Sequence, residues 1–128
     1  MQILLFPEAE ALGLQKLVWC QKLFSRVPWH AWVELVMPYY KSTIGRDTVC
    51  CPLDAMLRIH FVQRYLGLSD PAMACTLKTQ ALVRRLVGLP ENEHVVPDES
   101  AITELRRVLE LHRLTEDDLD SAGMLSRA

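Results

Sequence analysis

The sequence predicts an all-α protein, a compact bundle of about five to seven short helices with a helix-turn-helix-like arrangement over residues 69–113. Three observations predict this class. Apolar residues recur at the i, i+3, i+4 spacing of a buried helix face. Prolines, glycines and N-cap residues stand where short helices start and stop. Half of the 128 residues are hydrophobic and 23% are charged, which suits a folded core and excludes a disordered chain.

Two apolar stripes run along the first predicted helix, residues 8–25. One stripe consists of Leu14, Leu17, Val18 and Phe24. The other consists of Leu12, Trp19 and Leu23. We expect the second stripe either to pack on the next helix or to contact another subunit. That next helix begins near Trp29 and is expected to stop before Pro38, because proline disfavours helix continuation. Residues 41–51 show no period and are expected to form a loop.

The third predicted helix, residues 52–66, is apolar nearly all round, which is typical of a helix in the middle of a bundle. Asp54 and Arg58 are spaced to pair on its remaining polar strip. His60 lies inside the apolar stripe. We expect a core histidine with one hydrogen-bonded nitrogen, because the alternative, a catalytic base, needs an orienting partner that the sequence does not reveal.

Cap residues mark the remaining helices. The expected ends are Gly67 and Gly88, and the expected starts are Ser69 or Asp70, Asp98, and Thr115. A short helix over residues 80–87 precedes a loop over residues 89–97. The helix after Asp98 has a buried face made of Ile102, Leu105, Val108 and Leu109.

Acidic residues gather at the C-terminal end of the chain, although the net charge is only −2. Residues 1–40 are neutral, residues 41–113 carry +1 and residues 114–128 carry −3. This is not the charge of a strongly basic nucleic-acid binder. No apolar run reaches the ~20 residues of a membrane span, and residues 1–6 lack the basic start of a signal peptide. We therefore expect a cytoplasmic protein with no membrane partner.

The side chains that could hold a metal are poorly arranged for it. The cysteines are Cys20, Cys50, Cys51 and Cys75. None are spaced as Cys-x-x-Cys, so we expect reduced, buried thiols rather than a zinc site. The clustered acids are Asp117, Asp118 and Asp120. Acids are favoured in the first turns of any helix, and we prefer that interpretation to a metal site. We expect no cofactor and no metal.

The helix-turn-helix-like layout raises DNA binding as a function, because one helix of that layout lies in the major groove. Side chains suited to base edges are Ser100, Thr103 and Arg107. Side chains suited to phosphates are Arg84, Arg85 and Arg106. The alternative is an ordinary solvated helix face with Glu104–Arg107 and Arg106–Glu110 pairs. Residues 80–87 are a rival to residues 98–113 as the helix that enters a groove.

Three segments resemble the N-terminal region of InsH-like transposases, which are bacterial insertion-sequence enzymes with a DDE catalytic domain. The longest is residues 52–73, Pro-Leu-Asp-Ala-Met-Leu-Arg-Ile-His-Phe-Val-Gln-Arg-Tyr-Leu-Gly-Leu-Ser-Asp-Pro-Ala-Met. Another is residues 96–102, Val-Pro-Asp-Glu-Ser-Ala-Ile, continued by Leu105-Arg106 and residues 109–114. The upstream helix contributes Trp29, Val33, Glu34, Pro38 and Tyr39. The resemblance covers about residues 27–114 and weakens at residues 74–78, 100–101 and 105–107.

The resemblance implies a role in DNA transposition. The family's N-terminal helical region binds the terminal inverted repeats of the element and helps to assemble the oligomer, while a separate ribonuclease-H-like domain holds the catalytic acids and metal ions. The acids at residues 117, 118 and 120 do not match that catalytic motif, so we carry over no catalytic residue. We expect a truncated, non-catalytic fragment in the bacterial cytoplasm.

These inferences divide the chain into three parts. Residues 1–26 form an N-terminal helix with a candidate oligomer contact, residues 27–114 the transposase helical domain, and residues 115–128 an acidic, partly frayed tail. The leading hypothesis is a DNA-binding and assembly domain that acts on the terminal inverted repeats without catalysis. The alternatives are a helical module that associates with another copy or with full-length transposase, and an inert folded remnant.

Overall fold

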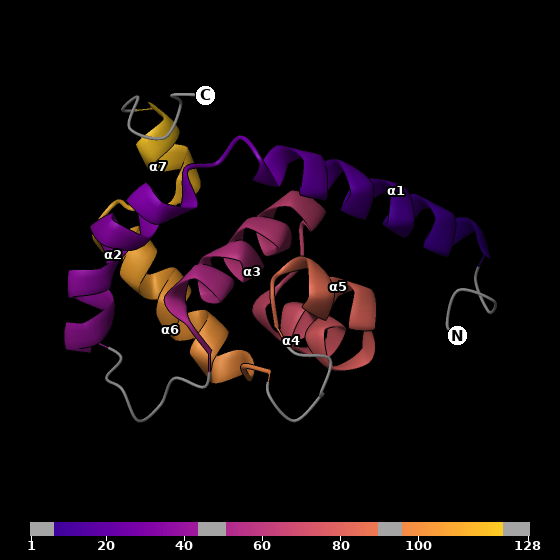
Figure 1. Ribbon diagram of the computed structural model, residues 1–128. Helices are drawn as coiled ribbons and strands as arrows, with labels where there is room; N and C mark the ends of the chain where they lie inside the picture. The colour runs from indigo at the N-terminus through magenta and orange to yellow at the C-terminus, as the bar shows by residue number, and fades with distance from the viewer. Residues whose placement is uncertain (1–6, 44–50, 90–95, 122–128) are drawn as a thin grey trace.

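The computed structural model describes residues 7–43, 51–89 and 96–121, and all regular structure in these ranges is helical. The helices are α1 (Pro7–Phe24), α2 (Trp29–Thr43), α3 (Leu53–Leu66), α4 (Asp70–Thr79), α5 (Ala81–Leu86), α6 (Glu99–Leu111) and α7 (Glu116–Ser121) (Figure 1). The predicted all-α class is confirmed. No described helix is both long and apolar enough to cross a membrane.

α3 lies in the middle of the bundle and packs against α1, α2 and α6 (Figure 1). Its buried residues point in nearly every direction around the helix: Leu53, Ala55, Met56, Leu57, Ile59, His60, Phe61, Val62 and Gln63. Asp54 and Arg58 pair on the remaining strip, with 3.2 Å between Oδ2 and Nη1. Both predictions for this segment, the central position and the surface pair, are confirmed.

Helix caps form where the sequence predicted them. The Ser69 hydroxyl accepts a hydrogen bond from the backbone N–H of Ala72 at 3.2 Å and starts α4. The Asp98 carboxylate accepts one from the N–H of Ala101 at 2.9 Å and starts α6. Gly67 ends α3 with a φ of 70°, a left-handed conformation that costs a residue with a Cβ atom roughly 1–2 kcal/mol.

The prediction that Pro38 ends the second helix is wrong, because α2 continues through it to Thr43. A proline in a helix interior costs roughly 3 kcal/mol, since it cannot donate a hydrogen bond to the carbonyl four residues earlier. Residues on both sides of it are nevertheless buried, namely Trp32, Val36 and Tyr40. Each such side chain contributes about 1.5–3 kcal/mol on burial, which outweighs the local cost. The predicted loop over residues 41–51 therefore starts later; its residues 44–50 lie outside the described residues.

Two thiols are buried as predicted. Cys20 is fully inaccessible and Cys51 is 5% exposed. Burial raises the pKa of the Cys20 thiol to about 12, so this group stays neutral. The prediction of a buried thiol is wrong for Cys75, which is exposed. It lies outside the buried face of α4, which consists of Met73, Ala74 and Leu77. Cys50 lies outside the described residues.

Aromatic rings join the end of α1 to α2 and α3. Phe24, Trp29 and Phe61 meet edge to face, with ring centroids 5.1 to 5.8 Å apart. Trp32 stacks on Trp29, and its indole N–H donates a hydrogen bond to the Leu114 carbonyl at 2.9 Å. That bond fixes α2 against the segment that follows α6.

The start of the acidic C-terminal segment is attached to the bundle. The Thr115 hydroxyl accepts a hydrogen bond from the Asp118 N–H at 3.2 Å and donates one to its carboxylate at 2.7 Å, which caps α7 as predicted. Asp117 pairs with Arg64 of α3, and Leu119 is only 3% exposed. The described part of this segment therefore belongs to the packed structure, while residues 122–128 lie outside it.

Candidate nucleic-acid interface

α6 is the helix that the sequence predicted to read DNA, and its two faces differ sharply. Its buried face consists of Ile102, Leu105, Val108 and Leu109, as predicted. This face packs on α2, α3 and α4. The exposed residues include Ser100, Glu104, Arg107 and Leu111. Leu111 is 75% exposed, so the outward face ends in an uncovered apolar residue.

Two of the predicted DNA-contact residues are bound to Asp70 at the start of α4. Arg106 approaches the Asp70 carboxylate with Nη2 at 2.8 Å and Nε at 3.2 Å. The Thr103 hydroxyl donates to the same carboxylate at 2.9 Å, and the Gln63 amide donates to it at 2.7 Å. These bonds join α3, α4 and α6. The side chains of Thr103 and Arg106 therefore hold helices together, although that of Arg106 is still 34% exposed. Their predicted DNA contacts stay predictions.

This cluster, Gln63–Asp70–Thr103–Arg106, is electrostatically strong. The Arg106 hydrogen bond, with help from Gln63 and Thr103, holds the pKa of Asp70 far below its usual range against the opposing effect of burial. The same pair raises the pKa of Arg106. The Asp70 side chain is only 11% exposed, so the pair is shielded from solvent on the carboxylate side.

Glutamates accompany both arginines of α6. Arg106 pairs with Glu110 at 3.2 Å, and Arg107 approaches Glu104 at 3.9 Å. These are the two pairs expected for an ordinary solvated helix face. The Arg107 side chain is still 68% exposed and can reach a partner. The predicted DNA contacts of Arg107 and Ser100 stay predictions.

Arg84 and Arg85 occupy opposite environments, although they are adjacent on α5. Arg84 is 7% exposed, and its Nη1 donates to the backbone carbonyls of Leu77 at 2.7 Å and Lys78 at 3.0 Å. These carbonyls lie in the last turn of α4, where the C=O groups have no N–H partner within the helix and accept hydrogen bonds from other groups. The structure thus places Arg84 as a structural side chain and not as the surface cation that the sequence suggested. Arg85 is exposed.

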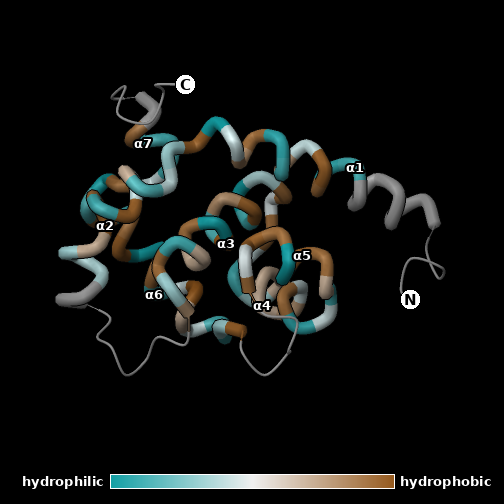
Figure 2. Tube along the Cα trace, in the orientation of Figure 1, coloured by the Kyte–Doolittle hydropathy of each residue, from teal (hydrophilic) through white to brown (hydrophobic). Residues whose placement is uncertain are grey.

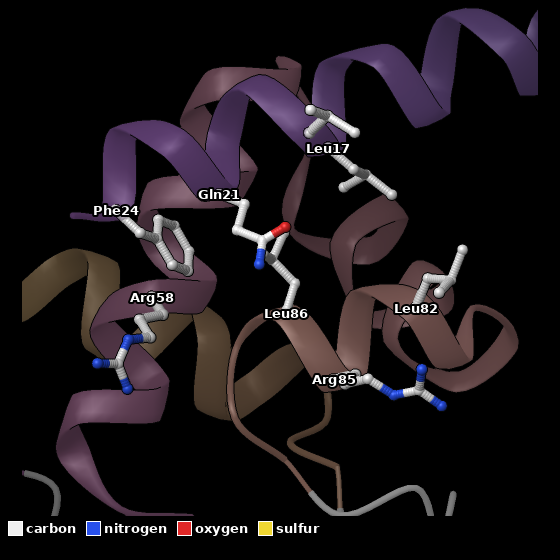
Figure 3. A pocket seen from close by; sticks show the side chains of 8 residues that line it. Leu17, Gln21, Phe24, Arg58, Leu82, Arg85 and Leu86 are labelled. Carbon is white, nitrogen blue, oxygen red and sulfur yellow. The ribbon is translucent and has the colours of Figure 1, made fainter.

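A groove of about 510 Å³ lies between α1, α3 and α5, and Arg85 lines it. Its lining is Leu17, Val18, Gln21, Phe24, Arg58, Leu82, Arg85 and Leu86. Figure 3 shows the two guanidinium groups on different sides of the opening, with Leu86 between Arg58 and Arg85 and Leu82 beside Arg85. Arg58 is also held by Asp54 and lies over the Trp29 ring at 5.1 Å. Sequence reasoning missed this groove, because its walls come from distant segments.

The second stripe of α1 is partly exposed. Trp19 is 52% exposed and Leu23 is half-buried, while the side chain of Leu12 lies outside the described residues. Lys22 Nζ lies 4.8 Å from the centre of the Trp19 ring. Figure 2 shows hydrophobic and hydrophilic residues interleaved along the coloured, C-terminal part of α1. The predicted oligomer contact stays a prediction, with Trp19 as its accessible member.

His60 is a core residue, as predicted, at 4% exposure. Burial, followed by the charges of Arg64 and Arg106, lowers its pKa to about 4, and only Asp70 acts in the opposite direction. Its Nε2 has no hydrogen-bond partner among the described residues. A small void beside it is lined by Met56, Ile59, Gln63, Ile102 and Leu105. Within the described ranges, no group of three His, Cys, Asp or Glu side chains is placed to hold a metal.

The comparison with known families decides what this helical bundle is. The family model described as Transposase domain (DUF772) matches residues 14–108. The chain belongs to that family. The match runs from the middle of α1 to α6, so this transposase domain contains α2 to α5 completely. It confirms the resemblance to InsH-like transposases. No solved structure matches the chain.

Proposed function

We propose that this transposase domain binds duplex DNA at the ends of an insertion sequence and helps to assemble the transposition complex. The observation that carries the proposal is family membership over residues 14–108. We assign the domain a role in DNA binding and assembly, and we assign it no step in DNA cleavage. Because the net charge is −2, its affinity for DNA without the correct sequence should lie at the weak end of the ~10⁻⁴–10⁻⁶ M range.

Fluorescence anisotropy tests this role directly. A labelled duplex carrying the ends of the host element is titrated with the protein at two salt concentrations, and a shuffled duplex of equal composition is the control. We expect tighter binding to the true ends, with a preference that persists at the higher salt concentration, since base contacts depend less on salt than phosphate contacts do. If the protein binds neither duplex, the proposal is overturned.

The exposed polar residues of α6 supply the first variants for sequence reading. Arg107 can contact guanine through two hydrogen bonds, and Ser100 can contact either a base or a phosphate. If Arg107 reads a base, Arg107→Ala lowers affinity for the true ends by about 1–3 kcal/mol and relaxes preference at one base pair. Equal weakening on every duplex would instead assign Arg107 to a phosphate.

A second candidate function is protein–protein assembly through α1. The observation that favours it is the exposure of Val18 at 50% and Trp19 at 52% on one helix. Buried tryptophans often dominate the binding energy of an interface. Trp19→Glu should then preserve the fold, as measured by circular dichroism, and abolish co-purification with full-length transposase. If neither DNA nor transposase binds, the inert-remnant hypothesis replaces both candidates.

A further inference from the structure

We propose that duplex DNA lies along the side of the molecule formed by α1 and α5, with its phosphates contacted by Lys22 and Arg85, and that the α6–α7 side faces away. This inference rests on the proposed DNA-binding function and names the surface that performs it. It reverses the expectation that α6 enters a groove of the DNA.

The first argument is the segregation of charge in the fold. Between residues 15 and 28, α1 and the turn after it carry Lys16, Lys22 and Arg26 and no acidic residue, whereas the start of α1 carries Glu8 and Glu10 in its sequence. Lys78 and Arg85 add exposed positive charge at the end of α4 and on α5. The described side chains on α1 and α5 are therefore net positive, although the net charge of the chain is −2.

The opposite charge gathers on α6 and α7. Their acidic residues, with the α6 N-cap, are Asp98, Glu99, Glu104, Glu110, Glu116, Asp117, Asp118 and Asp120. Arg106 is already engaged by Asp70 and Glu110, so it does little to offset them at the surface. The exposed arginines on this side are Arg64, Arg107 and Arg113, so a phosphate backbone laid here would meet more than two carboxylates for each of them, and like charges repel.

Distance weakens the effect of the α6 charges on the α1–α5 side. α3 lies between α1 and α6, and a helix with its side chains is about 10–12 Å across (Figure 1). The Debye length is about 8 Å at physiological ionic strength. Fixed charges on α6 are therefore largely screened at the α1–α5 side. Glu116 of α7 is an exception at the end of α1, because its charge, after burial, also raises the pKa of the Cys20 thiol.

The shape of the α1–α5 groove suits a ligand with both anionic and apolar parts. Arg58 and Arg85 lie on different sides of the opening (Figure 3), and two of the apolar residues that line it, Val18 and Leu82, are 50% and 48% exposed. Lys22 follows Val18 by one helical turn and lies next to the lining of the groove in sequence, with its Nζ 4.8 Å from the centre of the Trp19 ring. A DNA strand offers phosphates to the cations and deoxyribose carbons to the apolar floor. An acidic protein segment offers similar chemistry, but membership of a transposase family favours DNA.

The test compares two charge-neutralising variants in the whole chain. Lys22→Gln combined with Arg85→Gln removes the proposed phosphate contacts, and Arg107→Gln removes an exposed arginine from the α6 side. At ~0.1 M salt each phosphate contact contributes about eightfold in affinity and about 0.9 to the slope of log affinity against log salt. We expect the double variant to bind any duplex roughly 10- to 60-fold more weakly, with a salt slope lower by up to about 1.8. Arg107→Gln should stay within about twofold of the wild type.

Each outcome has a distinct meaning. Unchanged DNA affinity of the double variant, together with weakened binding by Arg107→Gln, would overturn the inference and leave the proposed function intact. Failure of the wild-type protein to bind any duplex would overturn the function itself. A double variant that binds DNA normally but changes its oligomeric mass would assign the groove to a protein and overturn the inference.

A lysine footprint on the wild-type protein tests the same inference without requiring that a variant folds. Acetylation of lysines by an amine-reactive reagent is followed by mass spectrometry, with and without duplex. We expect bound DNA to protect Lys22 at least severalfold. Equal labelling of Lys22 with and without a saturating duplex would contradict the proposal.

Discussion

The α4–α6 contact and the α1–α5 groove both contain arginines, but they use them differently. At the α4–α6 contact, Asp70 binds Arg106, and Thr103 and Gln63 complete the shell. At the groove, Arg85 is exposed and lines an opening of about 510 Å³. A basic pair in the sequence therefore does not by itself define a basic surface. A rotation of about 100° between adjacent helical residues sends one arginine inward and the other outward.

The largest expected effect lies on the α4–α6 side, at His60. The folded protein keeps this group neutral down to a pKa of about 4, whereas the unfolded chain takes up a proton near pH 6.5. Between these values the unfolded state binds more protons, so stability falls as the pH falls through this window. The loss reaches about 3 kcal/mol at pH 4 and is absent above pH 7.

Urea unfolding of wild type and His60→Leu across this pH range measures the effect. The substitution removes the titrating group and the Nε2 atom without a partner, so the pH dependence of its free energy of unfolding should be smaller than that of the wild type. Comparing the two proteins cancels the contribution of exposed carboxylates. Parallel pH profiles would show that His60 does not titrate differently in the folded and unfolded states.

The next effect tests Asp70, the centre of the same region. Asp70→Ala leaves Arg106, Thr103 and Gln63 without their shared acceptor and should lower the free energy of unfolding by about 2–3 kcal/mol at pH 7. Asp54→Ala is the matched control, because Asp54 also accepts from an arginine at 3.2 Å but its side chain is 48% exposed. We expect the control to cost under about 0.5 kcal/mol.

The stabilisation by Asp70 also depends on pH, because folding changes the pKa of its carboxyl group. The pKa of this carboxyl is lowered in the folded state, so its stabilisation is complete well above the ordinary value of 3.8 and is lost as the pH falls below it. The difference between wild type and Asp70→Ala should therefore shrink below about pH 4. A difference that stays constant to low pH would assign the effect to packing.

Arg84 and Arg85 allow a buried and an exposed arginine to be compared on the same helix, α5. Arg84→Gln breaks two hydrogen bonds to backbone carbonyls at the end of α4, and we expect a loss of about 2 kcal/mol in urea unfolding. Arg85→Gln changes an exposed side chain and should stay within about 0.5 kcal/mol of the wild type. Equal losses for the two variants would mean that burial does not distinguish these neighbours.

The sequence predicted the parts of the fold that local interactions decide. Ser69, Asp98 and Gly67 act within one helical turn, so their caps were readable from residue type and spacing. The course of α2 through Pro38 was not readable, because it depends on packing against distant helices. The same holds for Arg84, whose acceptors lie in another helix. Family resemblance identified the transposase domain, yet it did not reveal which arginines reach solvent.

The smallest expected effect on stability is at Arg107. It should be much smaller than the effect at the adjacent Arg106. Arg107 lies 3.9 Å from Glu104 and is 68% exposed, so Arg107→Ala should change the free energy of unfolding by under about 0.5 kcal/mol. Arg106→Ala removes the partner of Asp70 and should cost about 2 kcal/mol. Thermal and urea unfolding of the two variants measure the gap. If Arg107→Ala costs as much as Arg106→Ala, the α6 surface is part of the folded framework, and any DNA-binding defect of that variant reflects folding.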